Sequence, residues 1–382
     1  MTANSIEGTR SRTVATVSRA LWLAVIFDLL AFGVGFGWDR EWHTTHPFED
    51  FFSPPHIFVY TMHLLATLTL AYVAFTPSLR ARFGATFRLW PLPFPVPGPI
   101  AIAGGGFVVT ALAGLFDGIW HTAFGLDETG WSFPHSMLGA GIFVAFVGIA
   151  ACRWAIRGER PIGLPSALVF GFLLLATSAE RWTGPIGNNL APEVTRFIAR
   201  IPVLAVEPEF QHTTRIYLAY GIDRSHALFV PLAALSAGMG LALLRSFDAR
   251  ASVTLALTAL LTWTSTFVPL LVPGIVLVLF ARRRDQLAQT DDSERQARRD
   301  RRAWIVAGIA FTIVTAVIWR ANGGSAILGM LLFPVGVWLG RLIWSVADRP
   351  ARSRVLAFVA LAGIAYPAMT GIVDLALRSR VP

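Results

Sequence analysis

Long apolar runs separated by short polar stretches are the dominant pattern of this chain. Several runs reach the ~20 residues that a helix needs to cross the hydrocarbon core of a bilayer. The pattern predicts an all-α fold, a polytopic transmembrane helical bundle of about 10–11 spans. The predicted spans cover residues 17–38, 56–76, 98–120, 135–155, 163–181, 224–245, 251–281, 303–320, 324–345 and 354–377.

One apolar run, residues 251–281, is too long for a single simple span. Pro269 and Pro273 interrupt it, and proline breaks the hydrogen bonding of a helix interior. Both flanks are rich in Arg, which places them on the same side of the membrane. A tight hairpin of two short helices is therefore predicted, and a single tilted span is the alternative.

The composition also favours a membrane protein, because 54% of the residues are hydrophobic and only 14% are charged. Soluble domains carry roughly 25% charged residues. All 32 basic residues are Arg, and the net charge is +9. Because Arg clusters between apolar runs, we expect it to set the topology, and nucleic-acid binding is not indicated. The connections predicted to be cytoplasmic are residues 80–88, 153–160, 245–250, 282–302 and 349–354.

The segment 282–302 is polar and dense in charge. It is predicted to be a cytoplasmic linker between an N-terminal membrane bundle, residues 1–281, and a C-terminal membrane bundle, residues 303–382. A regulatory role or contact with anionic lipids is the alternative for this segment. The whole pattern indicates a multi-pass protein of the cell inner membrane, in contact with the lipid bilayer.

A polar motif occurs twice among the apolar runs. Residues 38–56 read "WDREWHTTHPFEDFFSPPH", and residues 116–135 read "FDGIWHTAFGLDETGWSFPH". Both copies contain Asp-x-x-Trp-His-Thr and then Ser-x-Pro-His, and each joins an outgoing helix to a returning one. We therefore expect a tandem repeat of one helical hairpin in residues 14–76 and 98–155, with both motifs on the outer, periplasmic or extracellular side.

The shared residues of the motif are of metal-ligating types. Asp39 and His43 are four residues apart, which places them on one face of a helix, and His56 opens the returning helix behind a Pro-Pro pair. One carboxylate and two imidazoles suit copper, iron or zinc with positions left open, whereas the lone Cys152 excludes a cysteine cluster. The predicted ligands are Asp39, His43 and His56 at one site, and Asp117, His121 and His135 at the other.

The first copy carries two further polar residues. Asp28 lies eleven residues before Asp39, and His63 lies seven residues after His56. In an uninterrupted α-helix both would lie nearly in line with the ligands and deeper in the membrane. We interpret them as a pair that supports the metal site or relays protons, and an ion pair between Asp28 and an Arg of the bundle is the alternative.

Other polar residues give weaker signals. The loop residues Glu49 and Asp127 are candidates to support the two sites. His212 and His226 repeat the thirteen-residue gap of the second copy and suggest a third metal site, although no acid precedes His212 by four residues. For all of these motifs, the alternative is that polar side chains cap helix ends beside a belt of interfacial tryptophans.

The stretch "DREWH…FFSPPHIFVY" resembles the C subunit of the copper-containing membrane monooxygenases, the particulate methane and ammonia monooxygenase family. The resemblance covers roughly residues 14–155. That subunit has a copper site with the spacing Asp-x3-His-x12-His and a second site with Asn-x3-His-x13-His. The spacings match the two predicted ligand sets, with Asp117 in place of the Asn.

This resemblance implies that both ligand sets bind copper. It also implies that the chain works with other membrane subunits to oxidise a small apolar substrate, or ammonia, with O2. Family enzymes also have a subunit with a soluble cupredoxin-like domain, which this chain does not contain, and the C-terminal bundle has no counterpart in the family subunit. Two other functions stay open: a stand-alone copper-handling membrane protein, and a zinc-dependent membrane hydrolase with Asp127 or Glu49 as base.

Overall fold

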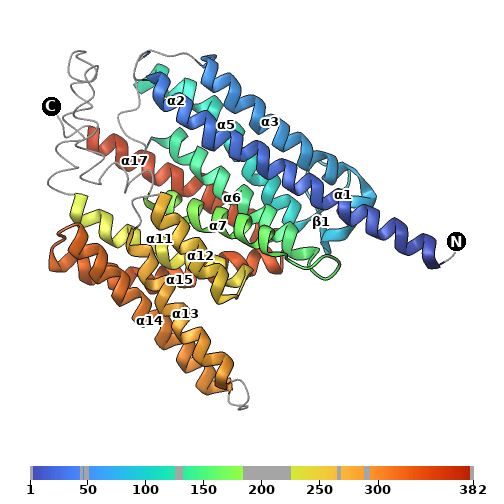
Figure 1. Ribbon diagram of the computed structural model, residues 1–382. Helices are drawn as coiled ribbons and strands as arrows, with labels where there is room; N and C mark the ends of the chain where they lie inside the picture. Colours follow the sequence, from blue (N-terminus) through green and yellow to red (C-terminus); the bar gives the residue numbers. More distant parts are fainter. Residues whose placement is uncertain are drawn as a thin grey trace.

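The computed structural model describes residues 3–43, 46, 51–124, 132–183, 225–264, 268–287 and 293–378. Helices make up most of this part of the chain and run side by side in one bundle (Figure 1). They are α1 (Ala3–Leu29), α2 (Phe36–His43), α3 (Pro54–Phe75), α4 (Pro77–Arg80), α5 (Gly98–Phe124), α6 (Phe133–Ala155), α7 (Leu164–Thr183), α11 (Ser225–Phe247), α12 (Ala251–Thr264), α13 (Leu271–Leu287), α14 (Ser293–Ile318), α15 (Gly323–Asp348), α16 (Arg352–Ala360) and α17 (Tyr366–Arg378).

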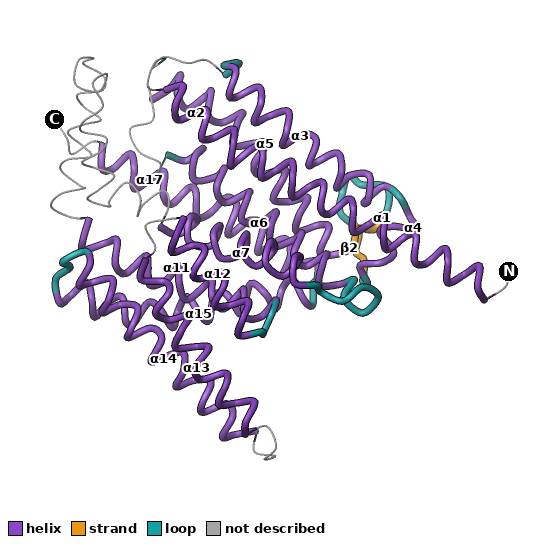
Figure 2. Tube along the Cα trace, in the orientation of Figure 1, coloured by secondary structure: helices purple, strands orange, loops and turns teal. Residues whose placement is uncertain are grey.

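Short non-α elements join some of these helices. Two π-helical turns, Leu30–Gly35 and Leu361–Ala365, connect α1 to α2 and α16 to α17. Between α4 and α5, strands β1 (Thr86–Arg88) and β2 (Pro95–Pro97) form a small antiparallel pair, drawn in orange in Figure 2. Each π turn lets two helices follow one another in nearly the same direction, so that together they cross the bundle.

Eight helical segments of the described chain are long and apolar enough to cross a membrane. They are Arg10–Asp39, Pro54–Phe75, Gly98–Trp120, Phe133–Ala155, Phe229–Phe247, Ala297–Ile318, Gly323–Asp348 and Arg352–Ala376, and three shorter apolar helices are Leu164–Ala179, Ala251–Trp263 and Leu271–Phe280. The predicted fold class, an all-α polytopic membrane bundle, is confirmed. The predicted spans coincide with these eleven segments, although only eight of them have the full length.

The run 251–281 folds as the predicted hairpin of two short helices. Helix α12 ends at Thr264, a 3-10 turn at Val268–Leu270 contains Pro269, and Pro273 lies in the first turn of α13. The two helices pack on each other closely enough that a Cβ atom on Gly274 would collide with the Thr258 side chain. The single tilted span, the alternative, is therefore wrong.

The C-terminal helices pack directly against the N-terminal ones. Gly336 and Gly340 of α15 lie on the backbone of α11, where any side chain at these positions would collide with Leu235 or Met239. Small residues four apart allow this approach of two helix backbones. The segment predicted as a linker, 282–302, is helical in its described parts, which are the ends of α13 and α14.

The Arg-rich connections gather at one end of the bundle. Glu159, in the turn after α6, accepts from Arg10 of α1 at 3.0 Å and from Arg82 of the α4–α5 connection at 3.4 Å. The indole N–H of Trp154 donates to Asp348 of α15 at 2.6 Å. These contacts join the N-terminus to three connections that are far apart in the sequence.

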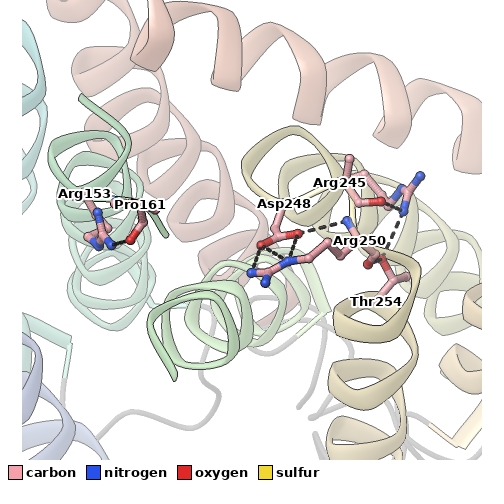
Figure 3. A network of polar contacts seen from close by, with 7 residues as sticks. Arg153, Pro161, Arg245, Asp248, Arg250 and Thr254 are labelled. Carbon is pink, nitrogen blue, oxygen red and sulfur yellow. Dashed lines mark hydrogen bonds and ion pairs between the residues drawn. The ribbon is translucent and has the colours of Figure 1, made fainter. Parts of the chain in front are cut away.

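Polar contacts within the connections hold the same end of the bundle together. Figure 3 shows Arg153 donating to the Pro161 carbonyl at 2.7 Å, and Arg250 paired with Asp248 at 2.6 Å. Phe247, at the end of α11, packs against the Trp154 ring with a centroid distance of 6.4 Å. The connections after α6 and after α11 are therefore neighbours, as expected if both lie on one side of the membrane.

Candidate metal centre

Both returning helices begin in the same way. Ser53 and Ser132 precede α3 and α6 with nearly equal extended backbone angles, φ −55° and ψ 149° against φ −50° and ψ 150°. Proline in the first turn favours a helix start, because it needs no hydrogen-bond partner there. His56 and His135 are therefore the third residues of their helices and hold equivalent positions.

Site one is formed where α2 meets α3, and its predicted ligands are Asp39, His43 and His56. The Asp39 Oδ1 atom lies 3.2 Å from Nε2 of His56, and both side chains are about one-fifth exposed. The His56 ring stacks on Tyr60 with a centroid distance of 5.7 Å, which helps to fix its orientation. His43 is the last residue of α2, one turn beyond Asp39, and its side chain lies outside the described part.

Site two is formed where α5 meets α6, and its predicted ligands are Asp117, His121 and His135. The Asp117 Oδ1 atom lies 3.9 Å from Nδ1 of His135, whose side chain is 44% exposed. The hydroxyl of Ser132 is 3.1 Å from the same Nδ1 atom. His121 lies one turn beyond Asp117 in α5, and its side chain is outside the described part.

The two Asp/His distances can be compared with the spacing of ligands on a metal. Ligands bound at about 2.0–2.2 Å and at angles of about 90–110° lie roughly 2.9–3.5 Å apart. The 3.2 Å separation of Asp39 and His56 falls in this interval. The 3.9 Å separation of Asp117 and His135 is wider, so this pair must close slightly to share an ion. The donor atoms fit a metal at site one better than at site two.

Among the side chains that the structure describes, no group of three His, Cys, Asp or Glu lies close enough to hold a metal ion. Each predicted ligand set has one member, His43 or His121, whose side chain falls outside this part. The structure thus brings together two of the three predicted ligands at each site, and the complete ligand sets stay predictions.

The two sites lie next to each other at the end of the bundle opposite the Arg-rich connections. Phe51, just before α3, and Tyr60 pack together with ring centroids 4.9 Å apart. A Cβ atom on Gly118, beside Asp117, would contact the Phe51 ring at 3.9 Å, and one on Gly114 would contact Tyr60 at 3.6 Å. The residues beside site one therefore pack on the helix that carries site two.

Asp28 and His63 form a buried pair inside the bundle. Asp28 Oδ1 lies 3.3 Å from His63 Nδ1, and the side chains are 1% and 10% exposed. The pair expected from the sequence is present, and the partner of Asp28 is His63 and not an Arg. The helix between Asp28 and Asp39 contains the π turn, which adds about one residue and rotates the following helix by about 100°. The alignment expected for an uninterrupted α-helix is therefore wrong on this side.

The remaining predicted residues give less information. Glu49, Asp127 and His212 lie outside the described residues, and so does the side chain of His226, which is in the first turn of α11. His46 is exposed and stacks on Trp42 with a centroid distance of 3.9 Å. The third metal site therefore stays a prediction.

Three contacts at these sites were not anticipated from the sequence. Ser132 faces His135, Tyr60 stacks on His56, and the Phe107 carbonyl faces His63 at 3.3 Å. The serine belongs to the repeated Ser-x-Pro-His pattern, and Tyr60 follows His56 by one helical turn. These signals were present in the sequence, whereas nothing in it singles out one backbone carbonyl.

The chain was compared with protein-family models, curated proteins and solved structures, and none of them matches it.

Proposed function

We propose that this protein is a copper-binding integral membrane protein that acts as a subunit of a membrane monooxygenase. The observation that carries the proposal is the paired geometry of the two sites: each returning helix presents a His within 3.2 or 3.9 Å of an Asp on the preceding helix. The resemblance to the C subunit of the copper membrane monooxygenases supports copper as the metal. The substrate is a small apolar molecule or ammonia, oxidised with O2.

The side of the membrane follows from charge. The Arg-rich connections lie at the end of the bundle opposite both sites, and such connections stay in the cytoplasm. We therefore infer that the sites face the outer side of the inner membrane. Partner subunits reach the sites from this side or within the bilayer.

The chain's own residues prepare each site for an ion. Asp39 and Asp117 offset part of the positive charge of a cation, and the neutral imidazoles of His56 and His135 present a lone pair. Tyr60 limits the rotation of the His56 ring by stacking on it. Copper held by these residues would supply electron transfer and O2 activation. Phe52, which is 70% exposed, adds an apolar side chain to the surface beside site one.

The experiment is copper loading of the detergent-purified chain, followed by elemental analysis and electron paramagnetic resonance. We expect about two coppers per chain with nitrogen-coupled Cu(II) signals, and the loss of about one copper in His56→Ala or His135→Ala. His46→Ala is the matched control, because His46 lies in the same connection as site one and belongs to neither ligand set. Its copper content should not change.

Three results would change the proposal. Full copper occupancy in the His56→Ala, His135→Ala double variant would refute the ligand assignment. Tight zinc binding with weak copper binding would favour the zinc hydrolase. Copper binding by a chain that purifies from its native membrane without partner subunits would favour the stand-alone copper-handling protein.

A further inference from the structure

The protonation of the buried Asp28–His63 pair follows from its third partner. Nε2 of His63 lies 3.3 Å from the carbonyl oxygen of Phe107 on α5. A carbonyl oxygen can only accept a hydrogen bond, so Nε2 carries a proton and donates it. The other ring nitrogen, Nδ1, lies 3.3 Å from Asp28 Oδ1. Because Nε2 carries the proton of the neutral ring, Nδ1 of the neutral ring has none and can accept a hydrogen bond.

This arrangement leaves one proton to be shared between Asp28 Oδ1 and His63 Nδ1. If the proton lies on Asp28, both groups are neutral; if it lies on His63, they form an ion pair without net charge. Removal of this proton leaves one net negative charge, and addition of a second leaves one net positive charge. Because an uncompensated charge is costly in a buried, apolar setting, the state with one shared proton is the resting state.

Other ionisable groups are too distant to replace either partner. Arg19 is exposed and nine residues from Asp28, which is about 13 Å along α1. Along α3, Tyr60 is about one turn from His63, His56 about two turns and Tyr72 about two and a half turns. The nearest titratable side chains on the surrounding helices are Arg19 on α1, His56, Tyr60 and Tyr72 on α3, Asp117 on α5, and His135, Cys152 and Arg153 on α6.

The pair and site one share a helix face, because His63 and His56 both belong to α3. His56, Tyr60 and His63 are at positions i, i+4 and i+7 of α3, so the three side chains follow one stripe over about 10 Å. Site two has no such stripe, because the positions that match Asp28 and His63 are Gly106 and Ile142. Such a polar pair is therefore present in the hairpin of site one and not in the hairpin of site two.

We propose that Asp28 and His63 form a proton-binding site inside the membrane, and that it exchanges its proton with site one along the His56–Tyr60–His63 face of α3. The link to site one rests on the proposed function. A cation held by Asp39, His43 and His56 would lose one unit of positive charge on reduction by an external reductant. The Asp28–His63 pair would supply one compensating proton toward the site and would take up another from solvent.

The proton-binding site itself is tested on the metal-free protein by infrared difference spectroscopy during a pH titration. We expect carboxyl and imidazole bands that titrate together, shift in D2O, and disappear in both Asp28→Asn and His63→Gln. Tyr72→Phe is the control, because Tyr72 lies on the lipid-exposed side of α3 and should leave these bands unchanged. If no titrating band is lost in Asp28→Asn, the pair holds a fixed proton and the proposal is wrong.

The exchange with site one is tested on copper-loaded protein in which site two is removed by His135→Ala. Proton uptake is measured with a pH-indicator dye in weakly buffered detergent when ascorbate reduces the copper. We expect about one proton per electron, with uptake lost in Asp28→Asn and slowed at least tenfold in Tyr60→Phe, which keeps the ring but lacks the hydroxyl. Unchanged uptake in Asp28→Asn would overturn the exchange.

The two failures can be told apart. If the native chain binds no copper, the proposed function fails, and the infrared titration still decides whether the pair binds a proton. If copper binds but the bands do not titrate, the proposed function stands and the proton-binding site does not exist.

Discussion

Hairpin one, formed by α1–α3, and hairpin two, formed by α5 and α6, carry the same motif but hold their helices together by different means. Deep in hairpin one, Asp28 meets His63. At the matching level of hairpin two, Gly106 lies against the backbone of Gly141 and Ala145, with no room for a side chain. A polar pair in one hairpin is thus replaced in the other by close contact of two backbones.

This difference follows from where each hairpin lies. In the most apolar 18-residue stretch of α6, 78% is buried inside the protein. In the corresponding stretch of α3, only 28% is buried. Helix α6 is therefore a core helix that must approach its neighbours closely, and small residues allow this. Helix α3 faces lipid over most of its surface, and its one buried stripe has room for a polar pair. Polar groups are costly to bury inside a membrane, and a buried polar pair there usually marks a functional site.

The largest effect is expected from Gly106→Val in hairpin two. The new side chain would collide with the backbone of Ala145, which cannot move aside as a flexible side chain can. We expect a loss of about 3 kcal/mol in stability, and little protein that elutes as a single species from a sizing column. Gly104→Val is the matched control in the same Gly run, because nothing lies within 4 Å of its Cβ position. Equal behaviour of both variants would contradict the close contact.

The second effect is expected from the buried pair of hairpin one. His63→Ala leaves the Asp28 carboxyl without its partner, and we expect a loss of about 3 kcal/mol in stability. Asp28→Asn should cost about 1 kcal/mol, because the amide still hydrogen-bonds to Nδ1 of His63. In the Asp28→Asn, His63→Ala double variant the loss should be smaller than the sum of the two single losses. The measurement is the unfolding of helical structure in detergent, and additive losses would show that the two residues act independently.

The elements of both hairpins could be predicted because apolar runs of sufficient length define them. The first-turn prolines Pro55 and Pro134 place His56 and His135 at helix starts, and the structure confirms this position. The glycines of α15 fit a small-residue pattern that indicates close packing but not its partner. Their partner helix, α11, could not be predicted, because the spacing of glycines along the sequence does not say which helix they pack against.

Other features could not be read from the sequence. The π turn at Leu30–Gly35 lies in an ordinary apolar stretch, and it changes the face on which Asp28 lies relative to Asp39. The choice of His63 as the partner of Asp28, against an Arg, follows from the distance between elements and not from residue type. The Asp/His pairs of the two sites were predicted from spacing alone, because helical periodicity and helix starts are local properties.

A smaller effect concerns the difference in affinity between the two sites. Site one holds its carboxylate and imidazole at a distance suited to a shared ion, whereas site two is wider and its Nδ1 atom already faces Ser132. We expect site one to bind copper about tenfold more tightly, and Ser132→Ala to raise the affinity of site two by less than about tenfold. Competition with a coloured copper chelator measures both. Ser53→Ala, at the equivalent position of site one, is the control, and the same gain at both sites would contradict the role of Ser132.

The smallest effect is expected at the other end of the bundle, where Glu159 after hairpin two joins Arg10 of hairpin one. The hydrogen bond from Arg10 and the charges of Arg10 and Arg82 lower the pKa of Glu159 below its usual value. A carboxyl whose folded-state pKa is lowered stabilises the fold above its unfolded-state pKa. This stabilisation is lost as the pH falls through the folded-state pKa.

Because these side chains are partly exposed, the contribution of Glu159 should be about 0.5 kcal/mol at neutral pH. Glu159→Gln should remove this part of the acid dependence of the thermal unfolding midpoint. Arg10→Gln should remove more of it than Arg82→Gln, because Arg10 is the closer partner, at 3.0 Å against 3.4 Å. An acid dependence that is the same in Glu159→Gln and in the unaltered protein would mean that this contact does not help to hold the two hairpins together.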